Sequence, residues 1–288
     1  MSSATLIDSA SVHAELDDPD LRILDATTIL RRDVAGGPYV VESGRPGFDR
    51  AHIPGAQFAD IPRTLSSPQS PYPFALPRAA EFAAAMRLLG VGTGTRVVAY
   101  SQGNPMWATR LWWLLRYFGF DDIAVLDGGL RAWVEAGYPV SGDLATYPPG
   151  EFVPAERTHL AATKDDVRRT LRGASACLLN ALPPAAFRGE GPGAYGRRGR
   201  IPGSLSIPAV DLIDPDSGRF QPPPVLAAAL EIALRTADGV PVIAYCGGGI
   251  SATVDIFALA LLGRDDAKLY DGSLTEWSAD PSLPLDVG

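Results

Sequence analysis

The amino-acid sequence predicts an α/β protein of two tandem domains, each with a mainly parallel sheet flanked by helices. Short apolar segments alternate with helical patterns along the chain, which is typical of a parallel sheet covered by helices. The same motifs also occur twice in the same order, with offsets of about 144 to 155 residues. Because a solenoid needs more copies, this duplication indicates two globular domains, for which 288 residues suffice.

In the first half, apolar segments predict strands at residues 21–26, 95–101 and 123–127. Helical periodicity predicts helices at residues 78–89, 105–118 and 130–136. The second of these helices begins with Pro105, which suits a first helical turn. It is apolar on nearly every side, so it either lies in the core of its own domain or packs a second apolar face against the other domain.

The repeat also predicts the domain limits. Residues 97–101 (VVAYS) correspond to residues 242–246 (VIAYC) in the second half. We expect a first domain at residues 1–140, a linker stiffened by prolines at 141–156, and a second domain at 157–288.

The most informative stretch of the second half contains a cysteine between a predicted strand and a predicted helix. Residues 242–246 form a short apolar run, and Ser251 is a plausible N-cap for a helix that continues to about residue 262. Glycine-rich backbone can curl and turn its amides inward, and a helix start adds partial positive charge. Because such surroundings stabilise a thiolate, Cys246 is a candidate nucleophile; the alternative is a buried structural cysteine. The candidate active-site loop after Cys246 consists of Gly247, Gly248, Gly249, Ile250, Ser251 and Ala252.

Composition excludes several classes of protein. A net charge of −8 and a pI near 4.9 argue against a nucleic-acid surface. Two cysteines, Cys177 and Cys246, are too few for a disulfide framework or a zinc site, and Cys177 reads as a small core residue. No secretory signal and no apolar run of membrane-spanning length is visible, so we expect a cytoplasmic protein without metal or membrane partner.

Three motifs resemble the rhodanese family of two-domain sulfurtransferases, of the thiosulfate and 3-mercaptopyruvate type. Residues 48–56 (FDRAHIPGA) look like its N-terminal signature, residues 267–277 (AKLYDGSLTEW) look like its C-terminal signature, and the cysteine loop is the third. The resemblance implies an inactive first domain, an active second domain with a persulfide on Cys246, and no cofactor. Ser101 stands where the repeat places Cys246, so the first domain offers no thiol there.

The chain departs from both branches of that family. Gly248 stands where the mercaptopyruvate branch has a serine, and Phe74 stands where it has a histidine, although Asp60 matches the aspartate of the same relay. Leu182 replaces an arginine that anchors the substrate, and both loop cations of the thiosulfate branch are absent. Neither donor is therefore assigned from the motifs alone.

The expected reaction is a double displacement in which Cys246 takes sulfur from a small anionic donor and passes it to cyanide, a small thiol or a protein thiol. An anionic donor favours a cation in the site, and we rank Arg188 and Arg198 as the better candidates, with Asp60 carried over from the resemblance. The alternative is a sulfur carrier or binding scaffold that does not turn over.

Other readings of single residues are less favoured. A Cdc25-type phosphatase would need an arginine at position 252, which is Ala252. His52 precedes an Ile-Pro-Gly turn and corresponds to an arginine in the second half, so we expect a structural role. Asp127 and Asp271 recur before glycines in both halves, which favours turn chemistry over catalysis.

Overall fold

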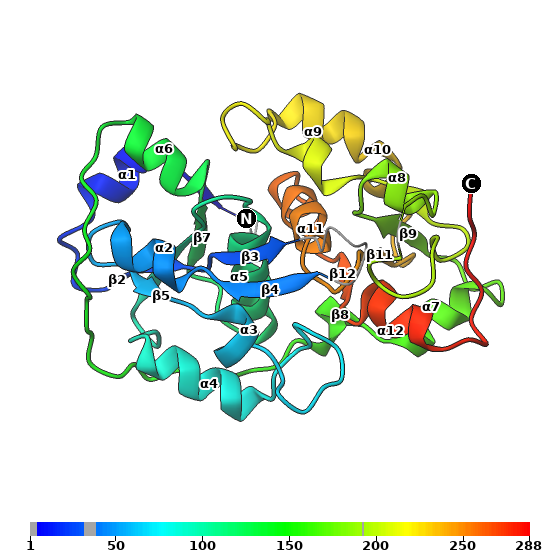
Figure 1. Cartoon of the computed structure of the whole chain (residues 1–288), viewed down its shortest axis with the longest axis horizontal. Helices are drawn as coiled ribbons and strands as arrows, with labels where there is room; N and C mark the ends of the chain where they lie inside the picture. Colours follow the sequence, from blue (N-terminus) through cyan, green and yellow to red (C-terminus); the bar gives the residue numbers. More distant parts are fainter. Residues whose placement is uncertain (1–4, 32–38, 192) are drawn as a thin grey trace.

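The computed structural model describes residues 5–31, 39–191 and 193–288, and they form two α/β domains that lie side by side (Figure 1). Each domain has a five-stranded sheet, with strand orders β5-β2-β6-β7-β1 and β10-β9-β11-β12-β8. Every pair within these two sheets is parallel. The two orders match strand for strand, so the structure confirms the predicted duplication and the α/β class.

The strands of the first domain are β1 (Leu6–Ile7), β2 (Leu21–Asp25), β5 (Gln57–Phe58), β6 (Arg96–Tyr100) and β7 (Ile123–Leu126), with an antiparallel hairpin of β3 (Thr28–Arg31) and β4 (Val40–Ser43). Its helices are α1 (Ser9–Ala14), α2 (Arg45–Arg50), α3 (Ile61–Thr64), α4 (Ala79–Leu88), α5 (Met106–Tyr117) and α6 (Gly129–Glu135). The three predicted strands and three predicted helices are confirmed to within two residues at each end.

The strands of the second domain are β8 (Ala161–Ala162), β9 (Cys177–Asn180), β10 (Leu205–Ser206), β11 (Val242–Tyr245) and β12 (Lys268–Tyr270). Its helices are η1 (Thr158–Leu160), α7 (Lys164–Thr170), α8 (Pro184–Phe187), η2 (Ala209–Leu212), α9 (Pro223–Ala229), α10 (Glu231–Leu234), α11 (Ala252–Leu261) and α12 (Ser273–Ala279). Residues 142–157 between the domains contain no helix or strand.

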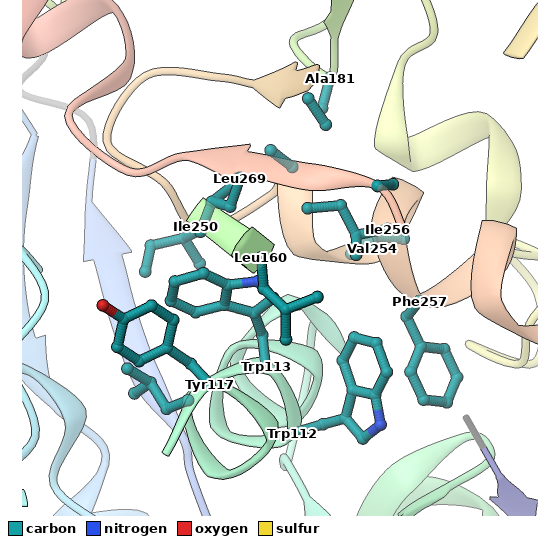
Figure 2. Close-up of a cluster of buried hydrophobic side chains, with 14 of the residues drawn as sticks. Trp112, Trp113, Tyr117, Leu160, Ala181, Ile250, Val254, Ile256, Phe257 and Leu269 are labelled. Atoms are coloured by element: carbon teal, nitrogen blue, oxygen red, sulfur yellow. The ribbon is translucent and has the colours of Figure 1, made fainter. Parts of the chain in front are cut away.

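Helix α5 packs against the second domain, as the second of the two predicted alternatives requires. Residues 107–117 are all buried, because one side of α5 covers its own sheet and another meets α11. The ring of Trp112 stands perpendicular to that of Phe257, with centroids 4.9 Å apart, and Figure 2 shows Trp113 beside Ile250. One buried apolar cluster therefore runs through both domains and fixes their relative position.

Two residues with predicted structural roles are buried in the fold. His52 stacks on Phe48, and its ring nitrogens bond the backbone carbonyls of Phe48 at 2.7 Å and Asp143 at 3.0 Å, which confirms the structural reading. Cys177 begins β9 and is buried. Within the described ranges, no helix is long and apolar enough to cross a membrane, and no group of three or more metal-ligating side chains gathers.

Candidate active site

Cys246 follows the carboxyl end of β11, the central strand of the second sheet, and lines a cavity of about 1210 Å³ between the two domains. Reactive groups of open α/β sheets commonly lie at this edge, because the loops after parallel strands meet there. The cysteine is only 2% exposed, so it lies at the floor of the cavity rather than on the protein surface.

The backbone of the cysteine loop (residues 246–252) presents hydrogen-bond donors that no other group in the described chain uses. The amides of Gly247, Gly248, Ile250, Ser251 and Ala252 have no acceptor within residues 5–31, 39–191 and 193–288. Buried N–H groups are nearly always paired, and successive free amides form a concavity that favours an anion. The loop is therefore suited to a thiolate or persulfide on the cysteine.

Two expectations for this loop are corrected. The amide of Gly249 does not belong to the free set, because it donates to the Ser273 hydroxyl at 3.1 Å. Ser251 occupies the N-cap position of α11, but its side chain caps no amide, because its backbone is already helical. Ser251 lines the cavity instead.

Ser273 fixes the loop from the other side. Its Oγ accepts the amides of Cys246 and Gly249, both at 3.1 Å, and donates to the Tyr270 carbonyl at 2.8 Å. The residue is fully buried with φ of 49°, an uncommon conformation that the corresponding Gly129 of the first domain also adopts at 56°. Ser273 was not among the predicted site residues; its signal in the sequence is that the repeat pairs it with Gly129.

A buried arginine from the first domain also holds the loop in place. Arg110 of α5 is 0% exposed; its Nη1 donates to the Asp271 carboxylate at 2.7 Å and the Gly249 carbonyl at 3.2 Å. Its Nη2 donates to the Phe74 carbonyl at 2.7 Å. The arginine thus connects the first domain with the loop of the second, and the apolar pattern of α5 gave no sign of this.

The two aspartates lie in turns after β7 and β12, as expected, and each also bonds across the domain interface. Asp271 pairs with Arg110 and accepts the amide of Leu76 at 2.7 Å, while Asp127 accepts the amide of Phe220 at 2.9 Å. Burial raises the pKa of Asp127 above its ordinary value. Asp127 and Asp271, which correspond in the repeat, therefore each accept a backbone amide from the other domain.

The two positions that depart from the mercaptopyruvate relay lie next to each other in the cavity. A Cβ placed on Gly248 would lie 3.8 Å from Cδ2 of Phe74, and both residues line the cavity with Cys246. Asp60 does not join them: it is the N-cap of α3 and accepts the amide of Arg63 at 3.3 Å. These three positions therefore form no proton relay. The side chains of Phe74 and Gly248 have no group that could donate a proton.

The ranked cations are not placed at the cysteine. Arg188 forms an ion pair with Glu190 at 2.6 Å, and Arg198 lines a neighbouring cavity of about 510 Å³. Arg197, which directly precedes Arg198 in the sequence, lines the cavity that contains Cys246. Leu182, where the family has an arginine, lines it as well.

A buried carboxyl group, Asp255, lies on α11 and was not singled out in the sequence. It is 0% exposed, and neither carboxylate oxygen has a hydrogen-bond partner within the described chain. Burial, with a smaller contribution from the charge of Cys246, raises the pKa of Asp255 well above its ordinary value. The group is therefore held in its neutral form well above the pH at which an exposed aspartate ionises.

The fold and the site together define a class of protein: two duplicated α/β domains in which the second presents a cysteine in an amide-lined loop. The Rhodanese-like domain model matches residues 8–136 and 163–280. The chain belongs to the rhodanese family, which confirms the resemblance drawn from its motifs.

Three relatives illustrate the family members to which this chain is similar. A probable 3-mercaptopyruvate sulfurtransferase of Pseudomonas aeruginosa is 35% identical over 294 residues, with 100% of both chains covered. The sulfur carrier protein TtuD of Thermus thermophilus is 31% identical over 296 residues, covering 98% of this chain and 96% of that protein. The crystal structure of SseA from Escherichia coli, a 3-mercaptopyruvate sulfotransferase, superposes with a TM-score of 0.82 at 32% identity, covering 94% of this chain and 98% of SseA.

Proposed function

We propose that this protein is a sulfurtransferase that moves a sulfane sulfur from thiosulfate or 3-mercaptopyruvate to a thiophilic acceptor through a persulfide on Cys246. The observation that carries the proposal is the position of Cys246 at the floor of the interdomain cavity, within a loop of free amides. The similarity to 3-mercaptopyruvate sulfurtransferases over the whole chain supports the same activity.

In the first step, the Cys246 thiolate attacks the outer sulfur of the donor and forms a new S–S bond. With thiosulfate, the bond between the two donor sulfurs breaks and sulfite leaves with the electron pair. With 3-mercaptopyruvate, the C–S bond breaks and the enolate of pyruvate leaves, which then takes up a proton. The free amides of the loop stabilise the anionic persulfide at the end of this step.

The two donors differ in their need for a proton, and this chain has no relay at Phe74 and Gly248 to supply one. Sulfite leaves without protonation, whereas the pyruvate enolate must be protonated, here by water. The loss of the relay therefore slows transfer from 3-mercaptopyruvate more than transfer from thiosulfate. Arg197 is the arginine placed to attract the anionic group of either donor.

The assignment of roles to the two domains is part of the proposal. Residues 157–288 form the catalytic domain, and residues 1–140 form a domain without a nucleophile that completes the cavity. Ser101 occupies the position of the cysteine in the first domain, and its hydroxyl donates to the Asn104 carbonyl at 2.8 Å. Arg110 gives the first domain a positioning role through its contacts with the loop and with Phe74.

A sulfur carrier that loads once and waits for a protein thiol is the second candidate. The similarity to the carrier TtuD and the altered positions Phe74, Gly248 and Leu182 favour it. Steady-state turnover separates the two, because an enzyme cycles with a small acceptor, whereas a carrier gives one equivalent of product and stops.

Intact-protein mass spectrometry tests the persulfide directly. We expect the wild type to gain the mass of one sulfur atom after incubation with thiosulfate or 3-mercaptopyruvate, and to lose it on addition of cyanide. Cys177→Ser is the matched control and should load normally, because Cys177 lies in β9, away from the cavity lining. Loading of Cys246→Ser, or no loading of the wild type by either donor, would refute the proposal.

A further inference from the structure

The cavity above Cys246 is larger and more apolar than a small anionic donor requires. Its volume of about 1210 Å³ exceeds the range of roughly 300–1,000 Å³ that is typical of pockets for drug-sized ligands. Thiosulfate has five non-hydrogen atoms, so it occupies only the end of the cavity at the cysteine. The apolar lining of the cavity includes Val41, Phe74, Met106, Leu182, Val210 and Ile213.

The charged side chains of the cavity are few and have protein partners, and of these Arg197 is the one assigned to the donor. Among the described lining residues they are Arg131, Arg197 and Asp214. Arg131 pairs with Glu135 at 2.7 Å, and Asp214 accepts the amide of Ser217 at 2.7 Å. Arg197 donates to three backbone carbonyls near the C-terminus of the chain. The acceptor enters after the donor remnant has left, and most of the lining then offers it apolar contacts rather than charge.

Phe74 is held in the cavity wall at an energetic cost. Its φ of 61° is an outlier for a bulky residue, and such a conformation persists only where the surroundings enforce it. The Arg110 guanidinium binds its carbonyl at 2.7 Å, and its ring packs edge-on against Trp107 with centroids 5.4 Å apart. The fold thus fixes a largely buried aromatic ring beside Gly248 in the cavity wall.

From this wall we infer that the acceptor is a small-molecule thiol with an aromatic or aliphatic body, which lies against Phe74, Leu182 and Val210 while its sulfur reaches the persulfide. The inference rests on the proposed function and names the substrate class of its second half-reaction. The acceptor thiolate attacks the outer sulfur of the Cys246 persulfide and forms a new S–S bond. The original bond to Cys246 breaks, its electron pair returns to Sγ as the thiolate, and the acceptor leaves as an organic persulfide. No external oxidant or reductant takes part.

The test separates sulfur loading from sulfur discharge. The wild type is loaded with sodium polysulfide, which bypasses the donor, and loading is checked by intact mass. Discharge by benzyl mercaptan is then compared with discharge by 2-mercaptoethanol and by the anionic 3-mercaptopropionate. We expect benzyl mercaptan to act at least about tenfold faster at low concentration and to saturate, because its ring transfers from water to the apolar wall.

A matched pair of valines tests the position of the acceptor. Val210 and Val225 are similarly exposed, at 53% and 46%, but of the two only Val210 lines the cavity. We expect Val210→Glu to remove most of the preference for benzyl mercaptan, and Val225→Glu to retain it. Leu182→Arg, at a more buried position of the same wall, should act like Val210→Glu.

The outcomes distinguish this inference from the proposed function. Equal discharge by all three thiols, or faster discharge by the charged one, would overturn the inference alone and favour an acceptor such as a protein thiol that approaches from the cavity mouth. A wild type that takes up no sulfur even from polysulfide would refute the proposed function. In that case, calorimetric titration of Cys246→Ser with benzyl methyl sulfide still decides whether the wall binds an aromatic ligand. Saturable binding that Val210→Glu weakens would support the inference, and its absence would overturn it.

Discussion

Asp255 offers a sharp test of the electrostatics beside the cysteine loop. The carboxyl group is fully buried and both oxygens lack partners in the described chain, so it should weaken the folded state. Burying a polar group without hydrogen bonds costs about 1–3 kcal/mol by mutational measurements. Valine is similar in size to aspartate and has no polar side-chain atom. Asp255→Val should therefore raise the free energy of unfolding by about 1–3 kcal/mol at pH 5.

The effect should also depend on pH, with a defined sign. Because burial raises the pKa of Asp255 in the folded state, the unfolded chain ionises first as the pH rises above the ordinary aspartate range. Between the unfolded and folded pKa values, the wild type loses up to about 1.4 kcal/mol of stability per pH unit. Asp255→Asn removes this ionisation but keeps the shape, so its advantage over the wild type should grow from pH 4 upward.

Urea denaturation at several pH values between 4 and 8 measures both effects. Asp238→Asn is the control, because Asp238 is exposed and should shift stability little at any pH. The reasoning fails if Asp255→Asn and the wild type keep a constant difference across this range, or if Asp255→Val is less stable than the wild type. Either result would mean that the carboxyl group has a stabilising partner in solution.

Three further substitutions test the contacts that hold the loop. Ser273→Ala leaves two loop amides without their acceptor, so we expect a loss of about 1–3 kcal/mol per amide in urea denaturation and slower sulfur loading. Arg110→Met leaves a carboxylate unpaired at the domain interface and should cost about 3–5 kcal/mol, whereas Arg235→Met breaks an exposed pair and should cost less than about 1 kcal/mol. Gly249→Ala would place a Cβ 2.6 Å from a backbone oxygen and should abolish loading. Gly263 also has a positive φ but open space around it, so Gly263→Ala should lower stability alone. Equal effects of either matched pair would contradict these contacts.

Much of the fold could be predicted because its signals are local. The strands and helices of the first domain depend on short apolar runs and on helical periodicity, both of which lie within windows of about 11–18 residues. The internal repeat added the domain plan, since a motif order that occurs twice implies two similar folds. The strand, glycine loop and helix around Cys246 were predictable for the same reason, because only the short loop separates β11 from α11 in the sequence.

The site residues outside that loop were less predictable, because their placement depends on contacts between distant parts of the chain. Arg188 and Asp60 have plausible chemistry and spacing, yet Arg188 pairs with Glu190 and Asp60 caps α3. Their neighbours in sequence offered nearer partners than the cavity did. Arg197 was passed over although it differs from Arg198 by one position, since only the path of the backbone decides which of the two lines the cavity with Cys246.

The sequence by itself determined the class of fold, the duplication, the single candidate nucleophile and the loss of the family's serine, histidine and arginine. Only the tertiary structure decided that Phe74 and Gly248 meet, that Arg110 binds the loop, and that Asp127 and Asp271 bond across the interface. The physical reason is distance along the chain. Arg110 and Asp271 are separated by 161 residues, so no local pattern encodes their contact. It forms because the apolar faces of α5 and α11 bury each other, and this packing brings Arg110 of α5 to the turn after β12 that contains Asp271.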